Sequence, residues 1–349
     1  MHADRNDLFD PGSSFVRDLS LHMRKKGVPA FALAILDGEH TQTLTLGASQ
    51  TDLFQCSVLS HWVTSVLILR LAQERKLDLH RDLSDLSSFR PLCSGKKAAP
   101  LTLAQLLSHS AGILPTYLPA YPRRAALPGV QDILWGHSPA RNRPLTRQLH
   151  PDLKGSYSAG GTVLAQAAVE ELLQSDFASL MQEYLFSPLG MEHSCFCVEP
   201  PVSPLPGHGH FRRRITGNYL LQPQGCLWTC AQDMEKLLSV FSPSGTYLTK
   251  ASCHFLSAPY HRSVFSLGLV CGTQGLAPCA MLGGGSHGYQ SKLLFFPEDS
   301  RAILMLANAN SAFPVFLRTQ YALYQALSWP YLPQEPSVQR RSTTHADQV

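Results

Sequence analysis

The sequence predicts an α+β fold in which strands from both ends of the chain form one antiparallel sheet. Strand patterns occupy residues 30–46 and return after about residue 260, whereas the residues between them show mainly helical periodicity. We therefore predict a sheet region from residues 14–50 and 260–330, with helices on its faces, and a large, mostly helical insertion from residues 51–259. The 349 residues are 44% hydrophobic, which is ample for an extensive core.

The first elements alternate between helix and strand. Apolar residues among polar ones predict a short helix over residues 14–26. Two β-rich runs follow at residues 30–36 and 41–46, and Asp37-Gly38 between them is a strong hairpin signal. From residue 60 to 73 the apolar residues change to helical spacing, so the chain passes from sheet to helix there.

Helices dominate the middle of the chain. Thr102 and Gln105 fit a capping box, and further helices are predicted over residues 162–173, 175–186 and 231–241. Residues 123–153 are rich in Pro, Arg and His without a period, so they are predicted to be loop.

Strand patterns return near the carboxyl end. Residues 264–270, 291–296 and 302–307 are apolar or alternating, and residues 297–300 form a turn between the last two runs. A helix over residues 315–327 closes the fold. The polar and basic residues 334–349 are expected to be a disordered tail.

Charge and hydropathy restrict the classes of partner. The formal net charge is only +4, and the basic runs at residues 24–26 and 212–214 are short, so a nucleic-acid partner is not expected. No run of about 18 apolar residues occurs, which argues against a membrane span. The amino terminus lacks the apolar segment of a signal peptide. We expect a soluble, by default cytoplasmic protein, although the compartment stays open.

The nine cysteines do not indicate a metal site. Cys195 and Cys197 are one residue apart and Cys226 and Cys230 are four apart, without histidines at the intervals typical of metal sites. His208 and His210 lie nearby, and we interpret them as loop residues. We expect buried free thiols, no metal and no cofactor.

The segment FQCSVLSHWVTSVLILRLAQERKLDL, residues 54–79, resembles the acylating segment of the serine β-lactamase and penicillin-binding-protein family, particularly its class C-like branch. That segment of the family reads approximately F-R-I-G-S-V-S-K-x-F-T-A and leads into a helix ending G-K-L-D-L. Phe54, Ser60, Val63 and Thr64 match it without a gap, as does the run KLDL at residues 76–79. This register puts Val58 at the position of the acylating serine and His61 at that of the lysine.

Other family landmarks follow in the same order. They are LTLAQLLSHSAGIL with His109 and Gly112, GSYSAGG with Tyr157 and Ala159, LFSPLGMEHSCF, QGCLWTCAQDMEKLL, and MLGGGSHGYQSKLLFFPE. The alignment places Tyr157 on the family's tyrosine, Ala159 on its asparagine and Leu282 on its His or Lys. The resemblance covers residues 14–327 and implies the β-lactamase/transpeptidase-like fold with a cleft between its two regions.

The resemblance in fold does not carry the chemistry with it. In the family, the serine attacks a carbonyl while the lysine and the tyrosine assist proton transfer; Val58 has no attacking atom. We therefore expect a pseudoenzyme that acts by binding or assembly, with Ser57 or Ser60 capping the helix. The partner would be an unknown small molecule or peptide in the cleft, and a homo-oligomer stays open.

Two alternatives remain. Ser57 and His61 are four residues apart, so they would meet if the helix already includes Ser57, giving a serine hydrolase for peptides, esters or amides with Tyr157 assisting. The other alternative is a structural protein that polymerises. Gly284 to Gly288 also fits the G-x-S-x-G nucleophile elbow, but that motif needs a helix after it and this one is followed by strand patterns.

Overall fold

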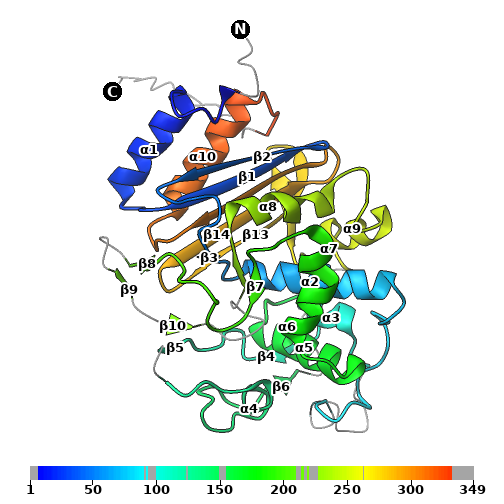
Figure 1. Ribbon diagram of the computed structural model, residues 1–349. Helices are drawn as coiled ribbons and strands as arrows, with labels where there is room; N and C mark the ends of the chain where they lie inside the picture. Colours follow the sequence, from blue (N-terminus) through cyan, green and yellow to red (C-terminus); the bar gives the residue numbers. More distant parts are fainter. Residues whose placement is uncertain are drawn as a thin grey trace, which may run out of the picture.

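A six-stranded antiparallel sheet forms the centre of the protein in a computed structural model. The structure describes residues 7–89, 92, 100–122, 125–148, 155–209, 214–215, 218–219, 227–261 and 263–331. The strand order is β12-β13-β14-β15-β1-β2, so the two ends of the chain meet where β1 pairs with β15 (Figure 1). The strands are β1 (Phe31–Asp37), β2 (His40–Leu46), β12 (Val270–Gln274), β13 (Ala277–Ser286), β14 (Tyr289–Phe296) and β15 (Arg301–Ala307). The predicted fold class is confirmed.

The central strand β1 shows why the sheet has helices on both faces. Its residues are buried up to Leu36, as expected for a strand covered on both sides. Phe31, Leu33 and Ile35 point into one apolar cluster with α1 and α10, whereas the alternate small residues Ala32 and Ala34 point into the other. The Asp37-Gly38 hairpin forms as predicted, with Gly38 in the left-handed region at φ 67°.

Two helices cover the outer face of the sheet and lie side by side (Figure 1). They are α1 (Ser14–Lys26) and α10 (Phe313–Ala326). The Ser13 hydroxyl caps α1 by accepting the Val16 N–H at 3.1 Å, and Gly27 ends it with φ 68°.

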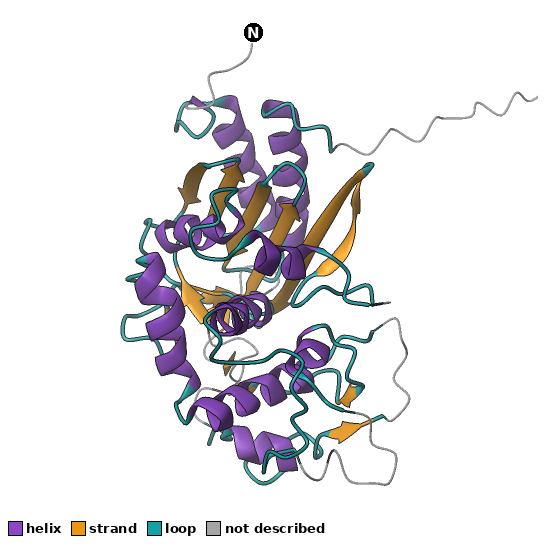
Figure 2. Cartoon of the chain, turned by 90° about the vertical axis from the view of Figure 1, so that its right-hand side faces the viewer, coloured by secondary structure: helices purple, strands orange, loops and turns teal. Residues whose placement is uncertain are grey.

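The other face of the sheet packs against helices of the middle region. Helix α8 lies against β1 and β2, and α2 lies against β13 and β14. Helix α9 also contacts β13, whereas other helices of this region lie farther from the sheet (Figure 2). The helices of this region are α2 (Leu59–Gln73), α3 (Leu103–Leu107), α4 (Val130–Trp135), α5 (Ala159–Leu173), α6 (Phe177–Met181), a π-helical turn (Gln182–Phe186), α7 (Ser187–Leu189), α8 (Ala231–Leu238), a 3₁₀ turn (Ser239–Phe241) and α9 (Lys250–Ser257).

Short strand pairs tie the helical region together. The largest group is a three-stranded sheet in the order β3-β11-β7. It joins the segment before α2 to the segments after α7 and before α8. The short strands are β3 (Phe54–Gln55), β4 (Ile113–Leu114), β5 (Tyr121–Pro122), β6 (Thr146–Arg147), β7 (Cys195–Phe196), β8 (Gly207–His208), β9 (Arg214–Ile215), β10 (Asn218–Tyr219) and β11 (Leu227–Thr229).

Several predicted boundaries are wrong. The strand expected at residues 264–270 begins only at Val270, because a turn around Ser266 and Gly268, at φ 108°, precedes it. Helix α4 interrupts the predicted loop 123–153; the Asp132 carboxylate accepts the Gly129 N–H at its start, and Gly136 ends it at φ 62°. Residues 334–349 lie outside the described residues.

Candidate active site

The segment before α2 turns sharply and then becomes helical. Strand β3 is followed by buried Cys56 and by Ser57, whose φ of 51° lies in the left-handed region. Val58 precedes the first residue of α2, which is Leu59, and no side chain caps the helix. The predicted capping by Ser57 or Ser60 is therefore wrong, because neither hydroxyl reaches the free N–H groups of the first turn.

Val58 packs against the glycine-rich part of β13. A Cβ added to Gly284 would lie only 2.5 Å from Val58 Cγ2, so the bare glycine backbone and the valine methyl group fit closely together. Val58 is half-buried, and it takes the place where the family resemblance puts the attacking serine. The first turn of α2 therefore presents hydrocarbon toward β13.

Ser57 and His61 do not form the proposed serine–imidazole pair. Ser57 precedes the helix, so the helical register that would bring it to His61 is not present. Ser57 Oγ, which is buried, has no hydrogen-bond partner within the described ranges, and neither has His61 Nε2. A hydroxyl without a nearby base stays a weak nucleophile.

His61 is held through its other ring nitrogen. Its Nδ1 lies 3.2 Å from Thr162 Oγ1 and 3.4 Å from Tyr157 Oη, and its ring stacks on the Tyr157 ring with the centroids 5.5 Å apart. Both hydroxyls can donate to Nδ1, which favours the tautomer with the proton on Nε2. Burial, reinforced by His109, lowers the pKa of His61 to about 3, so the imidazole is neutral at physiological pH.

His109 positions the tyrosine segment. Its Nδ1 accepts the Ser158 N–H at 3.2 Å, and its own carbonyl accepts the Ser156 N–H at 3.0 Å. The ring contacts the Tyr157 ring at 4.9 Å, and burial lowers the pKa of His109 to about 4. Burial also raises the pKa of Tyr157 above its ordinary value, so the phenol keeps its proton.

The positions of the family's other polar residues carry hydrocarbon. Ala159 is the first residue of α5 and is fully buried. Leu282 is 7% exposed in β13 and belongs to the core next to α2. The polar group that the resemblance leads one to expect at each position is replaced by a side chain that packs into the core.

Sequence reasoning missed the role of two matched landmarks. Ser194, at the end of the PLGMEHS segment, donates its hydroxyl to Asp233 Oδ2 at 2.7 Å and lies 2.7 Å from Thr229 Oγ1. The fully buried Asp233 carboxylate also accepts the His193 N–H at 2.9 Å. The two landmarks therefore bind each other and join β11 and α8 to the segment before β7. The available signal in the sequence was a polar residue in each of the two matched motifs, Ser194 in one and Asp233 in the other.

The G-x-S-x-G match is a β-hairpin and not a nucleophile elbow. Ser286 ends β13, Gly288 turns at φ 88°, and β14 begins at Tyr289, so no helix follows. Ser286 donates its hydroxyl to Gln55 Oε1 at 2.6 Å.

The described cysteines are free thiols. Cys56, Cys230 and Cys279 are buried, and the rest are half-buried: Cys195, Cys197, Cys253 and Cys271. Cys195 and Cys197 lie with their Sγ atoms 2.9 Å apart. Within the residues that the structure describes, no three His, Cys, Asp or Glu side chains gather as a metal site would require. In the same ranges, no helix combines the length and the apolar character needed to cross a bilayer.

The fold is the β-lactamase/transpeptidase-like fold, and the family comparison agrees. The sequence model of the Beta-lactamase family matches residues 16–327, and the chain therefore belongs to this family. It is 20% identical over 356 residues to a β-lactamase of Yersinia enterocolitica. The alignment covers 87% of this chain and 88% of that protein.

Solved structures show the same fold at low identity. The class C β-lactamase of Rhodobacter sphaeroides superposes with a TM-score of 0.69 at 16% identity, over 90% of this chain and 100% of that one. A D-stereospecific amidohydrolase from Streptomyces sp. superposes with a TM-score of 0.67 at 16% identity, over 86% of this chain and 95% of that one. The octameric penicillin-binding protein homologue from Pyrococcus abyssi superposes with a TM-score of 0.66 at 17% identity, over 91% of this chain and 78% of that one.

Proposed function

We propose that this protein is a non-acylating member of the Beta-lactamase family and acts by binding or assembly. The observation that carries the proposal is Val58 at the start of α2, packed against Gly284 where the family's attacking hydroxyl is expected. A valine side chain cannot form an acyl-enzyme.

The surroundings of Val58 support the same conclusion. A general base works best when its pKa is near the operating pH, and the pKa of His61 is about 3. Tyr157 keeps its proton because burial raises its pKa. Neither group therefore provides a proton acceptor that could activate Ser57 near neutral pH.

Reaction with an acylating probe tests the proposal. After incubation with a fluorescent penicillin and, separately, with a fluorophosphonate, we expect no covalent adduct by intact-mass measurement, whereas a class C β-lactamase treated in parallel is labelled. An adduct that disappears in Ser57→Ala would establish the alternative, a serine hydrolase using Ser57, His61 and Tyr157. An adduct that survives Ser57→Ala would refute both.

A peptide-like amide is the ligand that we propose for non-covalent binding. The names of two related structures, a β-lactamase and a D-stereospecific amidohydrolase, point to amide substrates for those proteins. Here Tyr117, which is 75% exposed, contacts the Tyr157 ring at 5.7 Å and continues an aromatic surface from buried His109 toward solvent. Such a surface suits an uncharged ligand with an apolar or aromatic group.

Thermal unfolding with and without ligand tests this binding. D-amino-acid amides and dipeptides with aromatic side chains should raise the melting temperature of the protein, and Tyr117→Ala should remove the shift. Val264→Ala, which also truncates an exposed apolar side chain, is the matched control. Shifts that are equal in both variants would exclude the aromatic surface as the binding site.

Assembly is the second part of the proposal. The Pyrococcus abyssi homologue is described as octameric, and a homo-oligomer is therefore proposed for this chain. Light scattering over a range of concentrations should give a mass above that of the 38.4 kDa monomer. A monomer at every concentration would refute assembly and leave binding untouched.

A further inference from the structure

The outer layer formed by α1 and α10 carries an uneven share of the charge. Helix α1 contains four basic residues, Arg17, Arg24, Lys25 and Lys26, with one acidic residue, Asp18, and α10 adds Arg318. Five positive charges and one negative charge give a net charge of +4, which equals the formal net charge of all 349 residues. Asp7 and Asp10 lie beside Leu8 and Phe15 at the amino-terminal end of α1, so the excess positive charge of this layer lies toward the carboxyl end of α1.

The charged residues lie on the side of each helix that faces away from the sheet. In α1, Arg17, Leu21, Arg24 and Lys25 follow the helical spacing of one stripe and are exposed, whereas the opposite stripe packs into the core. In α10, Arg318 and Tyr321 are exposed one turn apart. Both exposed stripes belong to the same outer layer.

The two helices run antiparallel, which brings their basic residues together. His22 of α1 hydrogen-bonds the backbone of Pro314 at the start of α10, so the basic end of α1 lies beside the first turn of α10. Burial lowers the pKa of His22, and the charges of Arg318, Lys26 and Lys25 lower it further. Arg318 of α10 and Lys25 and Lys26 of α1 therefore all lie close enough to His22 to affect its pKa.

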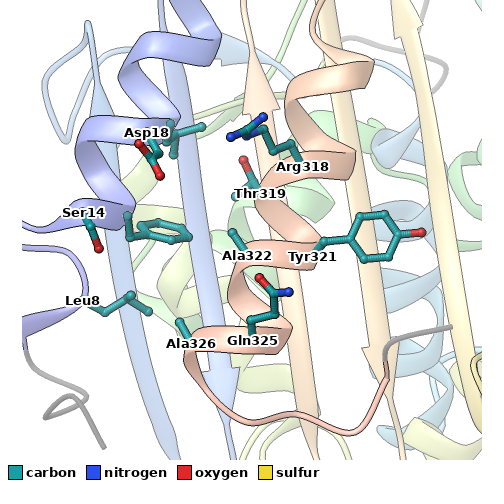
Figure 3. Close-up of a pocket in the computed structure, with 11 residues that line it drawn as sticks. Leu8, Ser14, Asp18, Arg318, Thr319, Tyr321, Ala322, Gln325 and Ala326 are labelled. Atoms are coloured by element: carbon teal, nitrogen blue, oxygen red, sulfur yellow. The ribbon is translucent and has the colours of Figure 1, made fainter. Parts of the chain in front are cut away.

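The same two helices also expose three apolar or aromatic side chains. Leu21 is 44% exposed, Phe313 is 53% exposed and Tyr321 is 38% exposed. A groove of about 570 Å³ runs between the helices, with Arg318 and Asp18 toward one end and Leu8 and Ala326 toward the other (Figure 3). Its apolar wall consists of Leu8, Phe15, Leu19, Ala322 and Ala326.

We propose that the outer face of α1 and α10 docks onto an anionic lipid surface. The basic residues would meet the lipid headgroups, while Leu21, Phe313 and Tyr321 would enter the boundary between headgroups and acyl chains. Exposed apolar residues surrounded by basic ones are typical of helices that lie in a membrane interface. A nucleic-acid backbone or an acidic protein would pair with the cations but would bury less of these apolar side chains. The combination of positive charge and exposed apolar groups therefore favours a lipid surface as the partner. This proposal is independent of the chemistry at Val58.

Co-sedimentation of the full chain with lipid vesicles tests the proposal. We expect binding to phosphatidylcholine vesicles that contain about 30% phosphatidylserine and little binding to phosphatidylcholine alone, because the attraction depends on anionic headgroups. Binding should weaken at about 0.5 M salt, where charges are screened. Equal binding to both vesicles, or no binding to either, would overturn the proposal.

Two variants identify the surface. Lys25→Gln with Lys26→Gln should lower the partition coefficient by about tenfold or more, whereas Arg143→Gln with Lys250→Gln removes the same charge from exposed positions outside the layer and should leave it unchanged. Leu21→Ser with Phe313→Ser should also weaken binding. If heparin or poly-glutamate binds as tightly and the Leu21→Ser, Phe313→Ser variant has no effect on vesicles, the partner is an acidic macromolecule and the lipid assignment fails. Circular dichroism of each variant verifies folding.

Discussion

Val58 and Gly284 occupy complementary space: a Cβ on residue 284 would lie 2.5 Å from Val58 Cγ2 and 3.2 Å from Val58 Cβ. The contact joins the start of α2 to β13, and so connects the helical region to the sheet. It also explains why residue 284 of β13 is a glycine. The branched valine has few rotamers with which to withdraw from an added methyl group.

Gly284→Ala should therefore destabilise the protein through overpacking, by about 1–3 kcal/mol. Val58→Ala removes the methyl groups that clash, so the double variant should be more stable than the sum of the single changes predicts. Urea unfolding of all four proteins gives the coupling energy. Gly283→Ala is the matched control, because an added Cβ there meets nothing closer than 3.5 Å. Additive effects of the two substitutions would show that the residues do not interact as described.

The sheet could be predicted because its strands carry local signals. The Asp37-Gly38 hairpin and the turn between the apolar runs of β14 and β15 specify these two pairings, and the apolar runs of β1 and β15 mark both as interior strands, which pair with each other. The exact start of α2 was harder to predict. Ser57 is buried and adopts a left-handed conformation that a serine rarely takes, so its residue type gave no local signal for this turn.

The partners of the candidate site could not be predicted from one sequence. Thr162 approaches His61 across 101 residues of chain, and only packing of α2 against α5 brings them together. The substitutions at Val58, Ala159 and Leu282 could be identified by alignment, but that Val58 fits against Gly284 needed coordinates. Motif order therefore predicted the fold and the altered positions, whereas it did not predict their contacts.

The Ser194–Asp233 pair gives a second prediction, about stability. Asp233→Ala removes the acceptor of the His193 N–H and leaves the buried Ser194 hydroxyl with Thr229 Oγ1 as its remaining partner, so we expect a loss of about 2–4 kcal/mol in unfolding free energy. Glu192→Ala, at an exposed neighbouring position, should change it by less than about 0.5 kcal/mol. Chemical denaturation measures both. A small effect of Asp233→Ala would mean that the two landmarks are not held together by this carboxylate.

Reintroducing the missing groups gives a third prediction. Val58→Ser with His61→Lys places a hydroxyl and an amine in the family's arrangement, and we expect slow labelling by a fluorescent penicillin, limited by Ala159 and Leu282. Val58→Ser alone should remain unlabelled, since the pKa of His61 is about 3 and its Nδ1 already faces two hydroxyls. Intact-mass measurement distinguishes the two variants. Equal labelling of both would show that His61 suffices as a base.

The buried histidines give a fourth prediction, about the pH dependence of stability. The pKa of His61 is about 3 and that of His109 about 4 in the folded protein, both below the ordinary value of 6.5. Below pH 6.5 the unfolded chain therefore binds protons that the folded protein does not, and stability falls as the pH falls from 6.5 toward 4.

Replacing one of these histidines should make that decline shallower. Each contributes about 1.4 kcal/mol per pH unit to the slope, so His61→Gln should reduce the slope by about that amount between about pH 4 and 6. Val264→Ala, at an exposed position with no titratable group, is the control and should leave the slope unchanged. The measurement is the free energy of unfolding in urea at a series of pH values. Because the slope is compared and not the absolute stability, a general destabilisation by the substitution does not affect the result, and an unchanged slope would mean that His61 titrates normally in the folded protein.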